Sequence, residues 1–460
     1  MNEQEFGDAK YSTKLFKEKI IQEIGENLNP TDIRQQIKNN RDYGRQEDIS
    51  VFHFLGDVTF NGEKAYVTSN DVINKDGPVK NCSVDIPGNY SSNSEYFKLP
   101  GSKAETKKSI DQCLSLLLTL EGKDRFFGQI TIPIATRSLL TDIAPVKFAF
   151  FFIGDSGNLK STGAAVLQSF SFPGITEESL SLNFDSTPNA MRLFSSILKN
   201  STVIIDDYNT SKVDDVLSEF LTLGSSKTTP RMTAKSASEL DQPVKTNTTI
   251  IVTGEHPLNT DKDSRHARVI YIEFLPNSIP IKKLSEIQKL AAQGVYFKAM
   301  IIFKQWILGN HERLVVEVKE KYEYFREKAA AELPDGTHRR LCENTADFFI
   351  GLYFFIDFCI EKGYLAEKDG TRYLDPYWKR IKRIISRQQE IIADYEPKGV
   401  FVRFIKKALS NGRLYLMSKN GFYIDDFRPL EKDDGSAGKL LGYVKDESGV
   451  FMCRLQLILM

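Results

Sequence analysis

A turn rich in glycine follows a strongly apolar segment in the first half of the chain. Residues 148–153 are all apolar, and a helix is expected from Ser161 onward. The turn between them has the residue types that bind phosphate: glycines that let backbone N–H groups point inward, a lysine and a hydroxyl. Lys160 would reach the β- and γ-phosphates of a nucleotide, and the Ser161 hydroxyl would hold Mg²⁺. The candidate nucleotide-binding residues are Gly154, Asp155, Ser156, Gly157, Asn158, Leu159, Lys160 and Ser161.

This loop departs from the usual P-loop pattern at one position. The usual pattern has glycine immediately before the lysine, and Leu159 stands there in this chain. The context that the motif requires, a buried strand before the loop and a helix after it, is predicted on both sides. The sequence therefore favours a site for ATP and Mg²⁺, with a purely structural glycine turn as the alternative.

A second apolar segment ends in two carboxylates. Residues 202–205 are followed directly by Asp206 and Asp207. Beside a P-loop this is the Walker B arrangement, in which Asp206 would bind Mg²⁺ through water and Asp207 would polarise the attacking water as a general base. Adjacent carboxylates repel one another unless a cation lies between them, which favours a metal here. A solvated Asp-Asp turn is the alternative.

Polar residues also flank two later apolar segments. Thr253 closes residues 248–252 and is the candidate for sensing the γ-phosphate. Arg265 and Arg268 precede residues 269–274, a place from which an arginine can stabilise charge on the γ-phosphate of a neighbouring subunit. Arg268 is the first candidate for such an arginine finger and Arg265 the second, with a plain surface arginine as the alternative.

Two groups of basic residues are candidates for contact with DNA. The first lies between the acidic strand end and Thr253, where loops of ring-shaped motors face a central channel. The second lies on an amphipathic helix expected around residues 378–387, for which a solvated helix face is the alternative. The first group is Lys227, Arg231 and Lys235, and the second is Lys379, Arg380, Lys382 and Arg383.

Alternating strands and helices are expected to position these residues. Continuous or alternating apolar patterns predict strands at residues 147–153, 179–184, 202–205, 248–252 and 269–274. Strands joined by helical links indicate an α/β fold with a parallel sheet and right-handed crossovers.

The flanking regions have other patterns. Helices are predicted at residues 12–24, 107–120 and 129–139 and through most of 282–362, and short β-structure at 51–100. The last eighty residues run helix, helix, then short strands at 414–417, 422–424 and 440–444, an order that resembles a winged-helix module. A length of 460 residues suits two or three domains. We expect a helical and β-rich domain at 1–115, a P-loop ATPase domain at 116–333, and a helical, winged-helix-like domain at 334–460.

The composition is that of an ordinary soluble globular protein. Sixty-one basic residues balance sixty-one acidic ones, which argues against a histone-like coating protein but leaves room for local basic patches. No apolar stretch is long enough to cross a membrane and the N-terminus is charged, so we expect a cytoplasmic protein. Scattered cysteines fit a reducing compartment, and the histidine spacing predicts no protein-bound zinc.

Together these segments resemble the replication ATPases of phages, integrative elements and staphylococcal cassette elements, a family related to AAA+ and superfamily 3 helicases. The resemblance also rests on residues 62–67 (GEKAYV), 96–100 (YFKLP), 187–190 (TPNA) and 253–255 (TGE). It implies an AAA+-like core and an ATP-driven, hexameric motor that encircles single-stranded or forked DNA. A primase or other replication proteins would be further partners. The resemblance gives the P-loop, the two aspartates, Thr253 and Arg268 the roles described above.

Three functions remain open from the sequence. The first is a DNA helicase or helicase loader. The second is a regulatory or scaffold protein that binds nucleotide without unwinding anything, which Leu159 and the neutral net charge favour. The third is an ATPase of a defence or partition system that acts on another protein. ATP hydrolysis that DNA stimulates would distinguish the first from the other two.

Overall fold

The computed structural model describes residues 49–86, 99–118, 127–180, 182–208, 247–260, 263–276 and 281–395. It also describes residues 221–222, 232–233, 236–240, 279, 405, 414–418, 439–444 and 451–453. The helix predicted at 12–24, the strand predicted at 422–424, and Lys227, Arg231 and Lys235 lie outside the described residues.

A four-stranded parallel sheet forms the centre of the molecule, as the sequence predicts. Its strands are β7 (Ala149–Ile153), β8 (Thr202–Tyr208), β11 (Thr249–Gly254) and β12 (Val269–Glu273), in the order β12-β7-β11-β8. Every residue of β7 and β11 is buried, which explains their continuous apolar character. The carboxyl ends of β7, β11 and β8 therefore lie next to one another along one edge of the sheet.

The prediction of a further strand at 179–184 is wrong. Residues 177–179 form a short 3-10 helix, η5 (Glu177–Ser179), and only an isolated parallel bridge joins Asn183 to Asp206. The Asn183 carbonyl accepts from the Ser186 amide and its side chain accepts from the Asp185 amide, which turns the chain away from β8. Local side-chain hydrogen bonds of this kind compete with a sheet ladder and end the strand.

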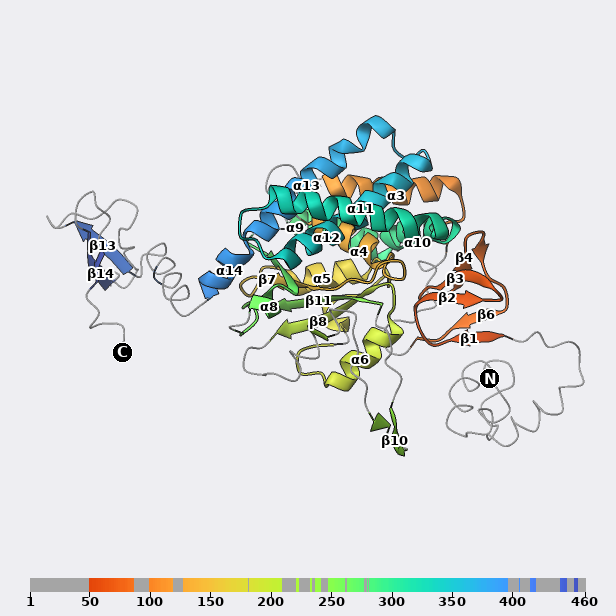
Figure 1. The fold of residues 1–460 in the computed structure, drawn as a ribbon, viewed down its shortest axis with the longest axis horizontal. Coiled ribbons are helices and arrows are strands. Elements are labelled where there is room, and N and C mark those ends of the chain that lie inside the picture. The colour runs from red at the N-terminus through yellow and green to blue at the C-terminus, as the bar shows by residue number, and fades with distance from the viewer. Residues whose placement is uncertain are drawn as a thin grey trace, which may run out of the picture.

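Long helices cover the sheet on one side (Figure 1). The helix α5 (Lys160–Gln168) follows β7 and packs on β8 and β11, while α6 (Pro188–Ile197) lies on the opposite side of the sheet in this view. The helices of the covering layer are α3 (Lys103–Leu118), α4 (Gly128–Ser138), α9 (Ile281–Ala292), α10 (Val295–Gly309), α11 (His311–Glu332), α12 (Arg339–Glu361) and α13 (Thr371–Ser386). One hydrophobic cluster joins these helices to the sheet.

α12 confirms a sequence prediction, and α6 begins at the segment 187–190 (TPNA) that contributes to the family resemblance. The apolar segment around 341–362 forms α12, which packs against α4 and α11. The side chain of Thr187 caps α6 by accepting a hydrogen bond from the Ala190 amide at 3.2 Å. In the described part of the chain, no helix is both long and apolar enough to cross a bilayer.

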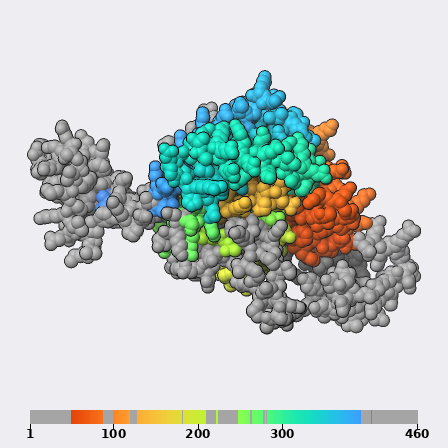
Figure 2. Space-filling view, viewed as in Figure 1, coloured from red at the N-terminus to blue at the C-terminus, as the bar shows by residue number. Residues whose placement is uncertain are grey.

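A small β-module lies beside the helical layer, and Figure 2 shows the two as adjoining surfaces. Its strands are β1 (Ser50–Phe52), β2 (Gly56–Phe60), β3 (Glu63–Val67), β4 (Val72–Asn74), β5 (Gly77–Pro78) and β6 (Cys82–Val84). A buried ion pair attaches the module to α10: Lys304 Nζ lies 2.6 Å from Asp57 Oδ2 and donates to the Leu139 carbonyl at 2.9 Å. Removal of either charge would leave the other buried without its partner, so this contact fixes the module in place.

The edge of the sheet at β12 is covered by the start of α14 (Gln388–Tyr395). The Gln388 side chain accepts from the Tyr271 amide at 2.9 Å and donates to the Tyr271 carbonyl at 3.0 Å. A buried amide thus replaces a neighbouring strand along part of β12. Covering an edge in this way protects it from pairing with another chain.

Two further small sheets lie outside the central core. The hairpin of β9 (Met232–Thr233) and β10 (Ser236–Leu240) occurs between β8 and β11 in the sequence. Near the C-terminus, β13 (Leu414–Ser418), β14 (Lys439–Val444) and β15 (Phe451–Cys453) form a three-stranded sheet. β13 and β14 confirm two of the strands expected there. The winged-helix resemblance and the division into three domains remain predictions.

Candidate functional site

The glycine-rich loop connects β7 to α5, as expected for a P-loop. Gly157 has φ of +82°, a conformation that favours glycine. A Cβ atom on Gly154 would lie 2.3 Å from the Phe274 carbonyl oxygen, so this position has room only for glycine. Asn158 Nδ2 donates to the same carbonyl at 2.8 Å, which ties the loop to the end of β12. The loop is therefore shaped by contacts on both of its arms.

Leu159 takes the conformation that the usual glycine would take. Its φ is 63° and its ψ is 28°, in the left-handed region. This conformation costs a residue with a side chain about 1–2 kcal/mol. The Leu159 side chain is half-buried and packs against the hydrophobic core, which offsets part of that cost. The departure from the usual pattern thus leaves local backbone strain and a loop of P-loop form.

Lys160 lies in the first turn of α5 and is 8% exposed. Its Nζ atom donates to the Asp155 carbonyl across the loop at 2.9 Å. Burial lowers the pKa of the Lys160 ammonium, and the negative charges of Glu255, Asp155, Asp206 and Asp207 act in the opposite direction. A partly desolvated cation at a helix N-terminus is suited to bind an anion.

Asp206 receives hydrogen bonds from two other segments of the site. Its Oδ1 atom accepts from Ser161 Oγ at 2.8 Å and also from the Thr253 hydroxyl. The structure therefore brings together the hydroxyl of α5, the carboxylate of β8 and the hydroxyl of β11. The sequence predicts all three as site residues but gives no reason to expect the bond between Thr253 and Asp206.

A β-bulge shapes the acidic end of β8. Ile205 pairs with Val252 and Tyr208 pairs with Gly254, so that Asp206 and Asp207 together lie opposite Thr253. A bulge bends the strand and redirects the side chains at its extra residue. Asp207 has φ of 59° and is exposed, and aspartate is among the residues that accept this left-handed conformation. β8 thus continues through both carboxylates instead of ending before them.

The donor set at this edge fits Mg²⁺. Ser161 and Asp206 supply only oxygen atoms, the ligands that Mg²⁺ prefers. Within the described residues, no group of three or more His, Cys, Asp or Glu side chains gathers to hold a metal. One or two carboxylates, with substrate phosphates and water as the other ligands, are the usual way in which proteins bind Mg²⁺.

Glu255 is a charged residue of the site that the sequence reasoning did not select. It directly follows Gly254 at the carboxyl end of β11, the strand between the P-loop strand and the acidic strand. Its carboxylate is the first among the charges that raise the pKa of Lys160 against the effect of burial. The signal in the sequence was an acidic residue after a strand that ends in Thr-Gly.

Arg268 lies at the amino-terminal ends of the strands, whereas the P-loop lies at their carboxyl ends. Its carbonyl accepts from the Ala149 amide at 3.0 Å, at the start of β7, and β12 follows it. Arg265 lies on the short helix α8 (Asp263–His266). His266 anchors this segment, since one ring nitrogen lies 2.8 Å from the Tyr271 hydroxyl and the other 2.9 Å from the Thr260 carbonyl. Arg265 and Arg268 thus lie near one another, and Arg268 lies apart from Lys160.

The basic residues of α13 do not form one free surface. Lys382 pairs with Glu332 at 2.6 Å, and Arg380 Nε donates to Gln129 at 3.3 Å. Burial lowers the pKa of the Arg380 guanidinium, with a further contribution from the charge of Arg383. Lys379 and Arg383 are exposed. The amphipathic pattern therefore reflects, in part, packing of this helix against its neighbours.

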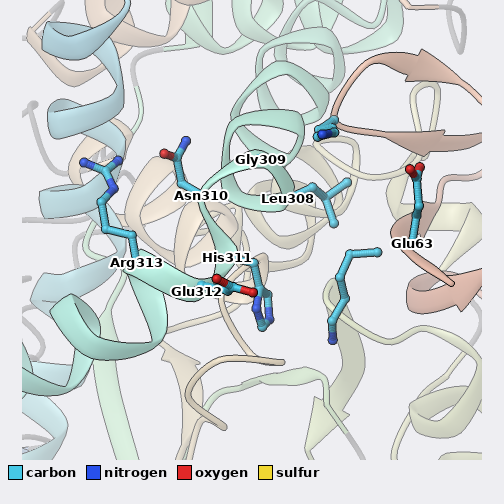
Figure 3. A pocket seen from close by; sticks show the side chains of 9 residues that line it. Glu63, Leu308, Gly309, Asn310, His311, Glu312 and Arg313 are labelled. Carbon is cyan, nitrogen blue, oxygen red and sulfur yellow. The ribbon is translucent and has the colours of Figure 1, made fainter.

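A cleft of about 510 Å³ lies between the β-module and the corner of α10 and α11. Figure 3 shows Glu63 on one side of this cleft and Asn310, His311 and Arg313 on the other. None of the residues predicted for nucleotide or DNA binding lines it.

Comparisons with known proteins bear on the fold. No family model matches the sequence, and no curated protein sequence matches it. A solved structure described as "SCCmec type IV Cch - active helicase" matches with a TM-score of 0.53 and 14% sequence identity, over 90% of this chain and 75% of that chain. This chain has the fold of that helicase. The resemblance to staphylococcal cassette helicases predicted from the sequence is thereby confirmed at the level of the helicase fold.

Two other solved structures match this chain more weakly. The C-terminal region of NrS-1 gives a TM-score of 0.29 at 15% identity, over 83% of this chain and 87% of that one. A JCV helicase gives 0.23 at 16% identity, over 54% of this chain and 74% of that one.

Proposed function

We propose that this chain is an ATP-hydrolysing motor of the replicative DNA helicase type from a phage or mobile element. The observation that carries the proposal is the meeting of the Ser161 and Thr253 hydroxyls at Asp206, beside Lys160 and the glycine-rich loop. A P-loop, a Walker B carboxylate and a polar residue on the intervening strand are the parts that hydrolysis of a nucleoside triphosphate requires.

Each part has a distinct task in this proposal. The amides of residues 154–161 and the Lys160 ammonium bind the phosphates, and Ser161 and Asp206 hold the metal. Mg²⁺, when bound, neutralises charge on the phosphates. Asp207 acts as the general base that orients and deprotonates the attacking water.

Arg268, with Arg265 as the second candidate, acts on the nucleotide of a neighbouring subunit. The length of the strands supports the action of Arg268 on a neighbouring subunit and not on its own. β12 has five residues, which span about 16 Å at the usual rise per residue, and Arg268 precedes it. An arginine side chain is too short to return over that length to its own P-loop. We therefore propose a ring, with six subunits as the expected number, and an AAA+-like core within each subunit.

DNA is the proposed substrate on which the motor acts. The hairpin of β9 and β10 occurs between β8 and β11, and Ala234 and Lys235 are the two residues between its strands. We propose that Lys227, Arg231 and Lys235 contact DNA phosphates in the ring channel, and that Lys379 and Arg383 add a second contact. Lys382 and Arg380 contribute only when their present contacts with Glu332 and Gln129 are broken. The motor would act in the cytoplasm, with a primase or other replication proteins as partners.

A regulatory protein that binds nucleotide without unwinding DNA is the second candidate function. Leu159 favours it, because the glycine that usually precedes the P-loop lysine is absent and the left-handed backbone at this position is energetically unfavourable for leucine. We also propose the three-part division at 1–115, 116–333 and 334–460 for either function.

Substitution of Lys160 tests the nucleotide site. We expect Lys160→Ala to lower affinity for Mg·ATP about ten- to a hundred-fold, since a charge-assisted hydrogen bond of this kind contributes roughly 1.5–3 kcal/mol. Titration with a fluorescent ATP analogue measures the effect. Lys147→Ala is the matched control, because Lys147 is exposed before the start of the same strand. Equal affinity in both variants would mean that residues 154–161 form only a turn.

A further inference from the structure

The hydroxyl of Thr253 joins both carboxylate residues of β8. Thr253 is 1% exposed. Its hydroxyl donates to Asp206 Oδ1 and accepts a hydrogen bond from the Asp207 amide at 3.1 Å. Thr253 is also the single residue that faces the bulge formed by Asp206 and Asp207. One side chain on the neighbouring strand thus holds the bulge at two points.

The chemistry of a hydroxyl limits what else Thr253 can contact. A threonine hydroxyl has one hydrogen to donate, and in this structure Asp206 receives it. Thr253 therefore has no hydrogen for a phosphate oxygen while that bond exists. This arrangement differs from the role of γ-phosphate sensor that the sequence predicts.

The hydrogen bond between the Asp207 amide and the Thr253 hydroxyl stabilises the bulge. The extra residue in a bulge lacks its place in the regular ladder, and Asp207 is in the left-handed region. The Thr253 hydroxyl accepts from the Asp207 amide in place of a strand partner. The same hydroxyl fixes one oxygen of Asp206, the oxygen that also receives the Ser161 hydrogen bond. Loss of the hydroxyl would remove one hydrogen bond from the Asp207 amide and one of the two that Asp206 Oδ1 accepts.

We infer that Thr253 is a positioning residue for the metal site: it orients Asp206 through the bulge whether or not a γ-phosphate is present. This inference rests on the proposed function, because it assigns Asp206 to Mg²⁺. Residues that hydrogen-bond to a metal-binding carboxylate typically change metal affinity by about 10- to 100-fold when they are replaced. A positioning role thus predicts a change in the Mg²⁺ requirement with any nucleotide, and a sensor role predicts a change specific to the triphosphate.

The test compares ADP with a non-hydrolysable ATP analogue at graded Mg²⁺ concentrations. Thr253→Val keeps the shape and removes the hydroxyl, Thr253→Ala removes it in a smaller side chain, and Thr253→Ser keeps it. We expect Val and Ala to raise the Mg²⁺ concentration for half-maximal binding of both nucleotides about tenfold or more. For Thr253→Ser, the Mg²⁺ concentration for half-maximal binding should remain near that of the wild type. Circular dichroism and thermal unfolding of each variant establish that it is folded. If only one of Thr253→Val and Thr253→Ala folds, that variant alone suffices for the test.

Other outcomes would overturn the inference. If the hydroxyl-free variants lose affinity for the ATP analogue alone, at an unchanged Mg²⁺ requirement, Thr253 is a phosphate sensor. An unchanged Mg²⁺ requirement with both nucleotides would mean that Thr253 serves only the fold. If the wild type binds neither nucleotide, the proposed function itself fails, and this inference fails with it.

Discussion

Subunits that carry Arg268→Ala are expected to bind ATP normally and to hydrolyse it about 10³-fold more slowly than the wild type. Arg268 lies before the start of β12, at the edge of the sheet away from Lys160 and Asp206. Its own P-loop is therefore out of reach, and binding within one subunit should not depend on it. Stabilisation of the γ-phosphate across an interface would be lost in every site of a ring made from this variant.

Mixing of variants distinguishes a shared site from a general defect. Arg268→Ala subunits have an intact P-loop, and Lys160→Ala subunits have an intact arginine, so a mixture should recover some hydrolysis that neither variant has alone. Arg339→Ala is the control for the loss of an arginine as such, because the side chain of Arg339 is 84% exposed on α12. If no mixture regains activity while both variants still assemble, the assignment of Arg268 to a shared site is wrong.

Asp207→Asn is expected to separate ATP binding from hydrolysis. Asparagine has the same shape and accepts the left-handed conformation of residue 207, so the bulge and its hydrogen bond to Thr253 should persist. The substitution removes the carboxylate that takes a proton from water. Turnover should fall by about 10² or more while affinity for ATP stays close to that of the wild type. Single-turnover hydrolysis and equilibrium binding measure the two quantities independently.

Asp206→Asn provides the contrast for this experiment. Asp206 accepts from Ser161 and is assigned to the metal, so its substitution should weaken Mg²⁺-dependent binding as well as turnover. Normal turnover in Asp207→Asn would exclude Asp207 as the base and direct attention to Glu255, the other carboxylate at this edge of the sheet.

The central sheet could be predicted from the sequence because its strands are buried on both faces. Continuous apolar segments such as 149–153 and 250–252 leave few alternatives to a parallel strand. The segment 179–184 alternates polar and apolar residues, a pattern that also predicts a strand, but the hydrogen bonds of Asn183 favour a turn there. Such side-chain competition depends on local geometry that periodicity does not describe.

The residues of the site could be predicted more completely than their contacts. Lys160, Ser161, Asp206 and Thr253 occur in the expected order, and the parallel topology brings them to one edge. The bulge in β8 depends on the register between β8 and β11, which the sequence does not reveal. For the same reason the double contact of Thr253 had no signal in the sequence. The sequence shows that Leu159 departs from the usual pattern, but it does not reveal the left-handed conformation of the backbone there.

ATP hydrolysis with and without single-stranded DNA tests most directly whether this chain is a DNA motor. We expect the wild type to hydrolyse ATP faster as single-stranded DNA is added, with a stimulation that declines as salt rises because phosphate contacts are screened. Lys160→Ala subunits should show only background hydrolysis under both conditions. A wild type that binds and hydrolyses ATP at the same rate with and without DNA, at low salt, would contradict the account.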